Sequence, residues 1–218
     1  MKEKLIVAKE ALKEIKDGMV IGLGSGSTAK LFIELLANKV RRQKLCIKCV
    51  PTSYDTEMFA IECGLDVVPP ASVKKIDVAV DGADYVCKEY AIKGGGGALA
   101  REKVVGYFAE QFIILVDSSK TKRRSKVPIE VLPFAYSTVM KELEKNKIPC
   151  SLRMSKTKLG PVITDNGNFL LDASMEIENA KEKEKWLNSI PGVVENGIFT
   201  KFSKILVGEG NKVEIIRP

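Results

Sequence analysis

Histidine is absent from all 218 residues of this chain. Its absence excludes Ser-His-Asp and Cys-His catalysis, histidine-ligated metals and histidine as a general base. Proton transfer near neutral pH must then fall to carboxylate, lysine, cysteine or tyrosine side chains whose surroundings shift their pKa values. Carboxylates are therefore the first residues to consider for acid–base chemistry.

Long apolar runs and paired cysteines are also lacking. The N-terminal stretch MKEKLIVAKEALKEIKDG carries charges every few positions, so it lacks the apolar run of a signal peptide or a membrane-spanning helix. The 5 cysteines have no framework spacing, which indicates a reducing compartment. Cys46 and Cys49 lack the second ligand pair of a zinc site, so we interpret them as ordinary packing in a strand. We expect a cytoplasmic protein with no membrane partner and no metal.

The net charge of +7 points to an anionic partner, either a nucleic acid or a phosphorylated metabolite. Part of the positive charge lies in KTKRRSK, residues 120–126. Neither a recognition motif nor interleaved aromatic and basic residues accompany this run, and such runs are usually solvated. We therefore expect no nucleic-acid partner and favour a small phosphorylated molecule.

Apolar patterns in the first half of the chain alternate between helix and strand. This alternation predicts a Rossmann-like parallel sheet with helices on both faces, and ligands bind such sheets at the carboxyl ends of the strands. The predicted helices cover 3–17, 27–40, 53–64 and 98–111, and the predicted strands cover 19–24, 44–50, 65–70, 75–84 and 112–120.

The pattern changes near VPIEVLPFA, residues 127–135, where two prolines bracket an apolar run. A strand, helix, strand, strand, helix, strand order follows, which is typical of a split β-α-β layer. We therefore expect a smaller ferredoxin-like α+β domain over 130–203, and a larger catalytic α/β domain formed by 1–129 and 204–218. The elements predicted after the apolar run are helix 136–146, strand 151–155, a turn at 164–168, strand 169–175, helix 180–190 and a strand around 197–200.

The motif GLGSGST, residues 22–28, lies between a predicted strand and a predicted helix. Glycines let the backbone approach an anion, the helix N-terminus offers unpaired N–H groups, and Ser25, Ser27 and Thr28 add hydroxyl donors. A P-loop would end in Gly-Lys-Ser/Thr, and the dinucleotide fingerprint would need glycine in place of Ser27. We expect this motif to bind a phosphate group, and a purely structural glycine-rich turn is the alternative.

Asp81 and Asp84 follow the apolar strand that ends in VAV. Two carboxylates at this spacing can point into one pocket, where mutual repulsion raises at least one pKa. Magnesium binding and the capping of a turn by aspartate are the alternatives.

Lys93 precedes a run of four glycines, residues 94–97. Such a run costs folding entropy, so close contact between backbone and ligand explains it better than an incidental loop. Glu102 follows in an early turn of the next helix, from which it can reach the space above the sheet. Pairing of Glu102 with a neighbouring Arg101 or Lys103 is the alternative.

Lys120 follows the predicted strand FIILV within the motif DSSK. A lysine here can neutralise a phosphate or a developing oxyanion, and solvated surface charge is the alternative. Because four such clusters follow successive strands, we expect them to converge on one cleft.

The motifs GSGST, DGAD, KGGGGALxREK, DSSK, VPIEVLPFA, TDNGNF and IPGVVENGIF resemble, in order and spacing, the type A ribose-5-phosphate isomerase family from about residue 4 to 208. The resemblance implies the interconversion of D-ribose 5-phosphate and D-ribulose 5-phosphate in the non-oxidative pentose phosphate pathway. It implies carboxylate-mediated proton transfer through an enediolate without a metal or cofactor. A homodimer or homotetramer is implied as well.

The resemblance also implies residue roles. Glu102 resembles the general base, Asp81 and Asp84 the carboxylates that assist ring opening and hydroxyl proton transfer, and Lys93 the cation near the oxyanion. Tyr85 departs from the family pattern, which usually has an acidic residue there. The implied substrate-binding positions are Ser25, Gly26, Ser27, Thr28, Gly82, Ala83, Gly94, Gly95, Gly96, Lys120 and Lys4.

Two further functions fit parts of the sequence. A glucosamine-phosphate deaminase would share the parallel sheet, but that family's mechanism relies on histidine. A sugar-phosphate-sensing binding module would keep the phosphate loop, yet it would not need Glu102, Asp81 and Lys93 together.

Overall fold

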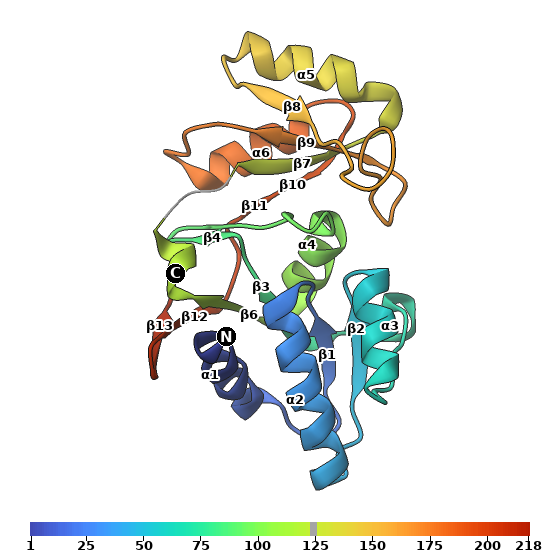
Figure 1. Cartoon of the computed structure of the whole chain (residues 1–218), viewed down its shortest axis with the longest axis vertical. Coiled ribbons are helices and arrows are strands. Elements are labelled where there is room, and N and C mark those ends of the chain that lie inside the picture. The colour runs from blue at the N-terminus through green and yellow to red at the C-terminus, as the bar shows by residue number, and fades with distance from the viewer. Residues whose placement is uncertain (123–125) are drawn as a thin grey trace.

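The computed structural model describes residues 1–122 and 126–218 (Figure 1). Three residues of the basic run 120–126 therefore lie outside the described residues. Figure 1 shows a larger sheet with its helices in the lower part of the view and a smaller sheet with two helices at the top.

The larger sheet has six strands in the order β13-β12-β6-β3-β1-β2. All neighbours are parallel except β12 and β13, which form an antiparallel edge. This arrangement confirms the expected α/β fold class with a mostly parallel sheet. The strands are β1 (Val20–Leu23), β2 (Lys48–Pro51), β3 (Ile76–Gly82), β6 (Ala109–Asp117), β12 (Lys204–Glu209) and β13 (Lys212–Ile216).

Helices cover both faces of this sheet, as expected. On β3, Val78 and Val80 pack toward α1 (Lys2–Ala11), α2 (Ser27–Gln43) and α3 (Tyr54–Glu62). Ala79 points the other way, toward α4 (Leu99–Phe108). Because successive residues of a strand face opposite sides, a sheet buried on both faces needs the unbroken apolar runs seen in the sequence.

The smaller sheet is antiparallel, with the strand order β10-β7-β9-β8. Its chain order matches the expected split β-α-β motif. Both helices contribute to one core with the sheet, which includes Ile129, Leu143, Leu171 and Leu187. The elements are β7 (Val127–Val131), α5 (Tyr136–Lys145), β8 (Cys150–Leu152), β9 (Phe169–Ala173), α6 (Ala180–Ser189) and β10 (Val193–Asn196).

A third sheet lies between the other two and consists of β4 (Tyr85–Val86), β5 (Ala91–Ile92) and β11 (Ile198–Phe199). The strand predicted around 197–200 belongs here, so its assignment to the split motif is wrong; β10 closes that motif instead. The backbone approaches closely at this crossing, since a Cβ on Gly197 would lie 2.4 Å from the carbonyl oxygen of Lys93.

Three further predictions differ from the structure. The segment 65–70 forms no full strand: it makes a single bridge between Val67 and Cys49, and prolines 69 and 70 have no N–H to extend a ladder. The helix predicted over 98–111 ends at Phe108, because Ala109 and the next residues pair with β3 as the start of β6. Helix α1 likewise stops at Ala11 and continues as a 3-10 turn over Leu12–Glu14.

Cys49 is buried within β2, as the packing interpretation predicts, whereas Cys46 is exposed just before it. Among the described residues, no helix is both long and apolar enough to cross a membrane.

Candidate active site

The glycine-rich loop between β1 and α2 is held against Asp81. A Cβ on Gly24 would lie 2.1 Å from the Asp81 carboxyl carbon, so only glycine permits this approach. Gly26 has a φ of +90°, which also favours glycine. The N–H of Ser25 donates to Asp81 Oδ1 at 3.0 Å. The loop and the first predicted aspartate therefore form one unit.

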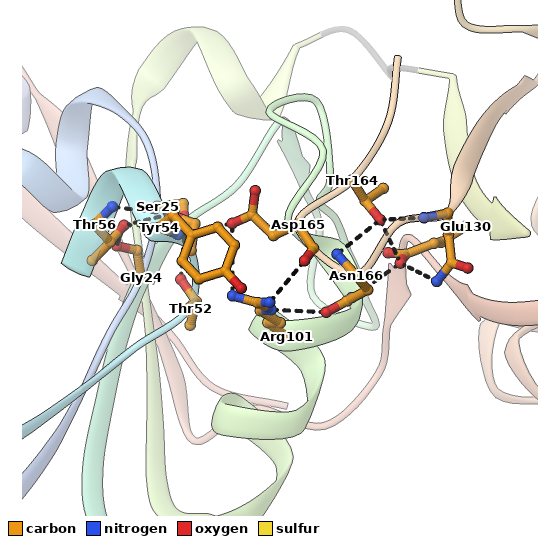
Figure 2. A network of polar contacts seen from close by, with 12 residues as sticks. Gly24, Ser25, Thr52, Tyr54, Thr56, Arg101, Glu130, Thr164, Asp165 and Asn166 are labelled. Carbon is orange, nitrogen blue, oxygen red and sulfur yellow. Dashed lines mark hydrogen bonds and ion pairs between the residues drawn. The ribbon is translucent and has the colours of Figure 1, made fainter. Parts of the chain in front are cut away.

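A cluster of hydroxyl groups supports this loop, and Figure 2 shows Thr52 and Thr56 close to Gly24 and Ser25. Ser25 Oγ lies 2.8 Å from Thr52 Oγ1 and 3.0 Å from Ser53 Oγ, and Thr56 Oγ1 donates to the Gly24 carbonyl at 3.0 Å. The sequence did not predict this role of the segment VPTS, residues 50–53. Ser53 was expected to begin a helix, and it does cap α3. The Ser25 hydroxyl thus holds the loop in shape.

Asp81, Lys93 and Glu102 form a buried acid–base cluster. They come from the end of β3, the segment after β5 and the first turn of α4, and their exposed fractions are 2%, 2% and 6%. Lys93 Nζ lies 2.8 Å from Asp81 Oδ2 and 3.3 Å from Glu102 Oε2, and it donates to the Gly82 carbonyl at 2.6 Å.

This geometry bears on the alternative left open for Glu102. The ammonium group of Lys93 stands between the carboxylates of Asp81 and Glu102. Glu102 contacts Lys93 and not its sequence neighbours, because Arg101 pairs with Asp165 and Lys103 pairs with Glu184 and Glu195.

The cluster has strongly shifted acidities. Burial raises the pKa of Glu102 to about 8, although the Lys93 charge opposes the shift. Burial likewise raises the pKa of Asp81 against the same opposition. Burial disfavours the charged form of Lys93, but Asp81 and Glu102 outweigh it and hold the pKa of that ammonium above its ordinary value. A carboxyl group poised near neutral pH beside a permanent cation is suited to move protons.

The glycine run after Lys93 forms a tight turn in which Gly94 and Gly97 have positive φ angles. The Gly97 N–H donates to the Gly94 carbonyl at 3.0 Å, and the Gly95 N–H donates to Asp84 Oδ2 at 2.7 Å. A Cβ on Gly95 would lie 2.5 Å from that carboxylate. The second predicted aspartate therefore binds the backbone of the glycine run.

These segments enclose a cavity of about 150 Å³. Lys4, Lys93 and Lys120 bring positive charge to it, and Lys4 Nζ donates to Ser27 Oγ at 2.9 Å. Asp81 does not line the cavity, but it contacts Lys93, which does. Tyr85 does not line the cavity either. Every other predicted site residue lines the cavity: Lys4, Ser25, Gly26, Ser27, Thr28, Gly82, Ala83, Asp84, Lys93, Gly94, Gly95, Gly96, Glu102 and Lys120.

A polar network that the sequence did not predict joins α4 to α3 and to the turn at 164–168 (Figure 2). The Arg101 guanidinium lies 4.4 Å from the centre of the Tyr54 ring and donates to Asn166 Oδ1 at 2.8 Å and to the Asp165 carbonyl at 2.9 Å. The Tyr54 N–H donates to Asp165 Oδ2 at 2.8 Å. The helix that carries Glu102 is therefore anchored at its first turn by the residue next to Glu102.

Glu130 in β7 organises the same turn from inside the smaller sheet. Its side chain is completely buried, and its Oε1 accepts from Thr164 Oγ1 at 2.9 Å, Asn166 Nδ2 at 3.0 Å and Asn168 Nδ2 at 2.8 Å. Nothing in VPIEVLPFA distinguished this glutamate from a surface residue. The TDNGN segment is a turn, as predicted, and its polar side chains face a buried carboxylate.

The α/β fold, with a small cavity at the carboxyl ends of β1 and β3 that holds three lysines and buried carboxylates, is typical of an enzyme that acts on a small molecule. The family model for ribose 5-phosphate isomerase A, also called phosphoriboisomerase A, matches residues 48–212. The chain belongs to this family.

Individual relatives cover nearly the whole chain. The ribose-5-phosphate isomerase A of Methanococcus aeolicus is 50% identical over 220 residues, which is 98% of this chain and 94% of the relative. The solved ribose 5-phosphate isomerase A of Methanocaldococcus jannaschii has a TM-score of 0.96 at 46% identity and covers 99% of this chain and 98% of its own. A D-ribose-5-phosphate isomerase solved in complex with phospho-erythronic acid matches with the same TM-score of 0.96, identity of 46% and coverage of 99% and 98%.

Proposed function

We propose that this chain interconverts D-ribose 5-phosphate and D-ribulose 5-phosphate, with Glu102 as the general base. The membership of the isomerase family supports the reaction. The observation that carries the mechanism is the burial of Glu102 in the wall of a cavity that three lysines line, 3.3 Å from the Lys93 ammonium.

In this mechanism Glu102 takes the proton from C2 of the open-chain aldose. The electron pair left behind forms an enediolate, and its negative oxygen is stabilised by Lys93 and by backbone N–H groups of the glycine run. The proton then returns to C1 while the C2 oxygen becomes the carbonyl of the ketose. Asp81 and Asp84 are assigned to ring opening and to the transfer of the hydroxyl proton.

The phosphate is assigned to the loop at 25–28 with Lys4 and Lys120. The N-terminus of α2 and the two lysines supply donors and positive charge on one side of the cavity. A relative that binds phospho-erythronic acid supports a phosphate-bearing polyol as the ligand. Anchoring the phosphate orients C1 and C2, which contributes to the rate.

A sugar-phosphate-sensing module of the same fold is the second candidate. Such a module needs the phosphate loop, but it gains nothing from two buried carboxylates around a lysine, which cost desolvation energy. The cluster of Asp81, Lys93 and Glu102 therefore favours catalysis over sensing.

The test is the Glu102→Gln variant, which keeps the shape of the side chain and removes its basicity. Its kcat should fall by about 10²- to 10⁴-fold, which is what a missing general base costs. Formation of ribulose 5-phosphate is followed directly, with EDTA present in a parallel assay, and deuterium at C2 should exchange with solvent in the wild type. Unchanged activity in Glu102→Gln, or loss of activity with EDTA, would falsify the mechanism.

We also propose that the chain works as a homodimer or homotetramer in the cytoplasm. Phe134 and Leu159 are large apolar side chains with exposed fractions of 99% and 100%, which supports a partner surface. All five cysteines are free, which suits a reducing compartment.

A further inference from the structure

Arg153 reaches from the smaller sheet to the glycine run of the cavity. It follows β8, and its Nη1 donates to the carbonyl oxygens of Gly94 at 3.0 Å and Gly95 at 3.1 Å. Its Nε donates to Asp172 Oδ2 at 2.8 Å, and its Nη2 contacts the other oxygen of that carboxylate. One guanidinium thus joins a strand pair of the smaller sheet to two carbonyl groups beside the reacting cluster.

The position of the guanidinium fixes the direction of two peptide groups. In a planar trans peptide the carbonyl and the N–H point opposite ways. The Gly94 carbonyl faces Arg153, and the N–H of the same peptide, on Gly95, donates to Asp84 in the cavity wall at 2.7 Å. The Gly95 carbonyl also faces Arg153, so the N–H of the next peptide, on Gly96, points toward the cavity as well.

The Gly96 N–H is the donor left for a ligand. Gly96 lines the cavity, and within residues 1–122 and 126–218 its N–H donates to no protein group. A cation on the carbonyl side also polarises the peptide, which makes its N–H a stronger donor. An N–H held in this way suits an oxygen that becomes negative during the reaction.

We propose that Arg153 is a positioning residue for the isomerase: it orients and polarises the Gly94–Gly96 peptides so that the Gly96 N–H stabilises the enediolate oxygen. The inference rests on the proposed function for its kinetic part. It assigns to a residue of the smaller domain an indirect part in the chemistry of a cavity that this residue does not line.

The contact requires arginine. Asp172 pairs with Ser151 across β8 and β9 and lies diagonally opposite Arg153, so its two oxygens orient the planar guanidinium and leave one nitrogen aimed at the glycines. A lysine ammonium is a single point charge and cannot hold both partners in this fork. The conservative substitution should therefore fail.

The experiment compares Arg153→Gln and Arg153→Lys with the wild type. For both variants kcat should fall by about 10- to 100-fold, less than the loss of a donor that touches the oxyanion itself. KM for ribose 5-phosphate should change by less than about threefold, because the residues assigned to the phosphate are untouched. The inhibition constant of phospho-erythronic acid should rise, while that of inorganic phosphate should stay constant.

The matched control is Arg41→Gln. Arg41 also donates to a backbone carbonyl, that of Cys63 at 2.9 Å, but it lies near the far end of α2. The Arg41→Gln variant should keep wild-type kcat. The amide resonance of Gly96, followed by ¹⁵N NMR, should shift in Arg153→Gln and stay in place in Arg41→Gln.

Wild-type kcat in Arg153→Gln, full rescue by Arg153→Lys, or an equal loss of phosphate affinity would overturn the proposal. An inactive wild-type enzyme would instead refute the proposed function. In that case the Gly96 resonance still reports separately whether Arg153 sets the geometry of the peptide.

Discussion

Lys93 is the counter-ion of both Asp81 and Glu102 in the buried cluster. Its substitution leaves two buried carboxylates without a cation. Breaking a buried ion pair on one side costs about 3–5 kcal/mol. The ion pair, and not the hydrophobic contacts of the lysine stem, should therefore dominate the effect.

We expect Lys93→Met to lower the free energy of unfolding by about 3–5 kcal/mol at pH 9 and by less at pH 5, where the carboxyl groups protonate. Urea unfolding at the two pH values measures the difference. Lys30→Met is the control, since Lys30 pairs with Asp55 at 2.9 Å on the surface, and such pairs contribute about 0–1 kcal/mol. Equal losses in the two variants would contradict the assignment.

The raised pKa of Glu102 also predicts the pH dependence of the reaction. A general base must be ionised in the free enzyme, so kcat/KM should rise as the pH passes through about 8. Because Asp81 and Lys93 interact with Glu102, the midpoint belongs to the cluster as a unit. Initial rates at low substrate concentration measure it, and a profile that is flat from pH 6 to 10 would argue against this base.

At the scale of elements, the turns that follow β1 and β3 were predictable. GSGST and DGAD combine glycines with polar residues directly after apolar strands of the parallel sheet, whose carboxyl ends share one edge. KGGGG instead follows β5 of the antiparallel third sheet, where no strand was predicted. The contacts made by Arg153 and Glu130 were not predictable. Glu130 lies in β7 and Arg153 directly after β8, both in ordinary strand patterns, and their partners are brought to them only by tertiary packing.

The bounds of β6 and the loss of a strand at 65–70 have a similar cause. Ala109 and its neighbours continue a helical pattern in the sequence, yet pairing with β3 outweighs that local preference. Apolar residues at 65–68 suggested a strand, but the two prolines that follow remove the N–H groups of a ladder. Local sequence patterns thus predicted the order of these helices and strands more accurately than the residues at which they begin and end.

The approach of the β1–α2 turn to β3 gives a prediction for Gly24. In Gly24→Ala the new Cβ would lie 2.1 Å from the Asp81 carboxyl carbon and 2.5 Å from its Cα, so the turn or the strand must move. We expect a loss of about 1–3 kcal/mol in stability, as for overpacking, together with loss of activity.

Gly96→Ala is the stability control for this change, because no atom lies within 4 Å of its Cβ and its φ is not positive. Thermal melting compares the two variants. A Gly24→Ala protein as stable as Gly96→Ala would show that the turn does not need this approach.

For the whole molecule, we propose a division into a catalytic domain of 1–129 with 204–218 and a smaller domain of 130–203. The strand β7 begins at Val127, so the first boundary falls within a strand of the smaller sheet. Arg153 and the Arg101 network join the two parts through polar contacts close to the cavity.

The proposed assembly is tested by sedimentation at several protein concentrations. We expect a species of two or four chains, because exposed apolar side chains such as Phe134 and Leu159 favour burial against a partner. A single-chain mass at every concentration from about 1 to 100 μM would contradict the proposal.

The cavity is lined by segments scattered from Lys4 to Lys120 along the chain, and its glycine run is held by Arg153 from further on. Contacts so distant in sequence form late, since each requires a long loop to close. Regain of enzymatic turnover after dilution from denaturant should therefore lag behind the return of helical signal. For this protein, the recovery of enzymatic turnover would therefore report that both the larger and the smaller sheet have finished folding.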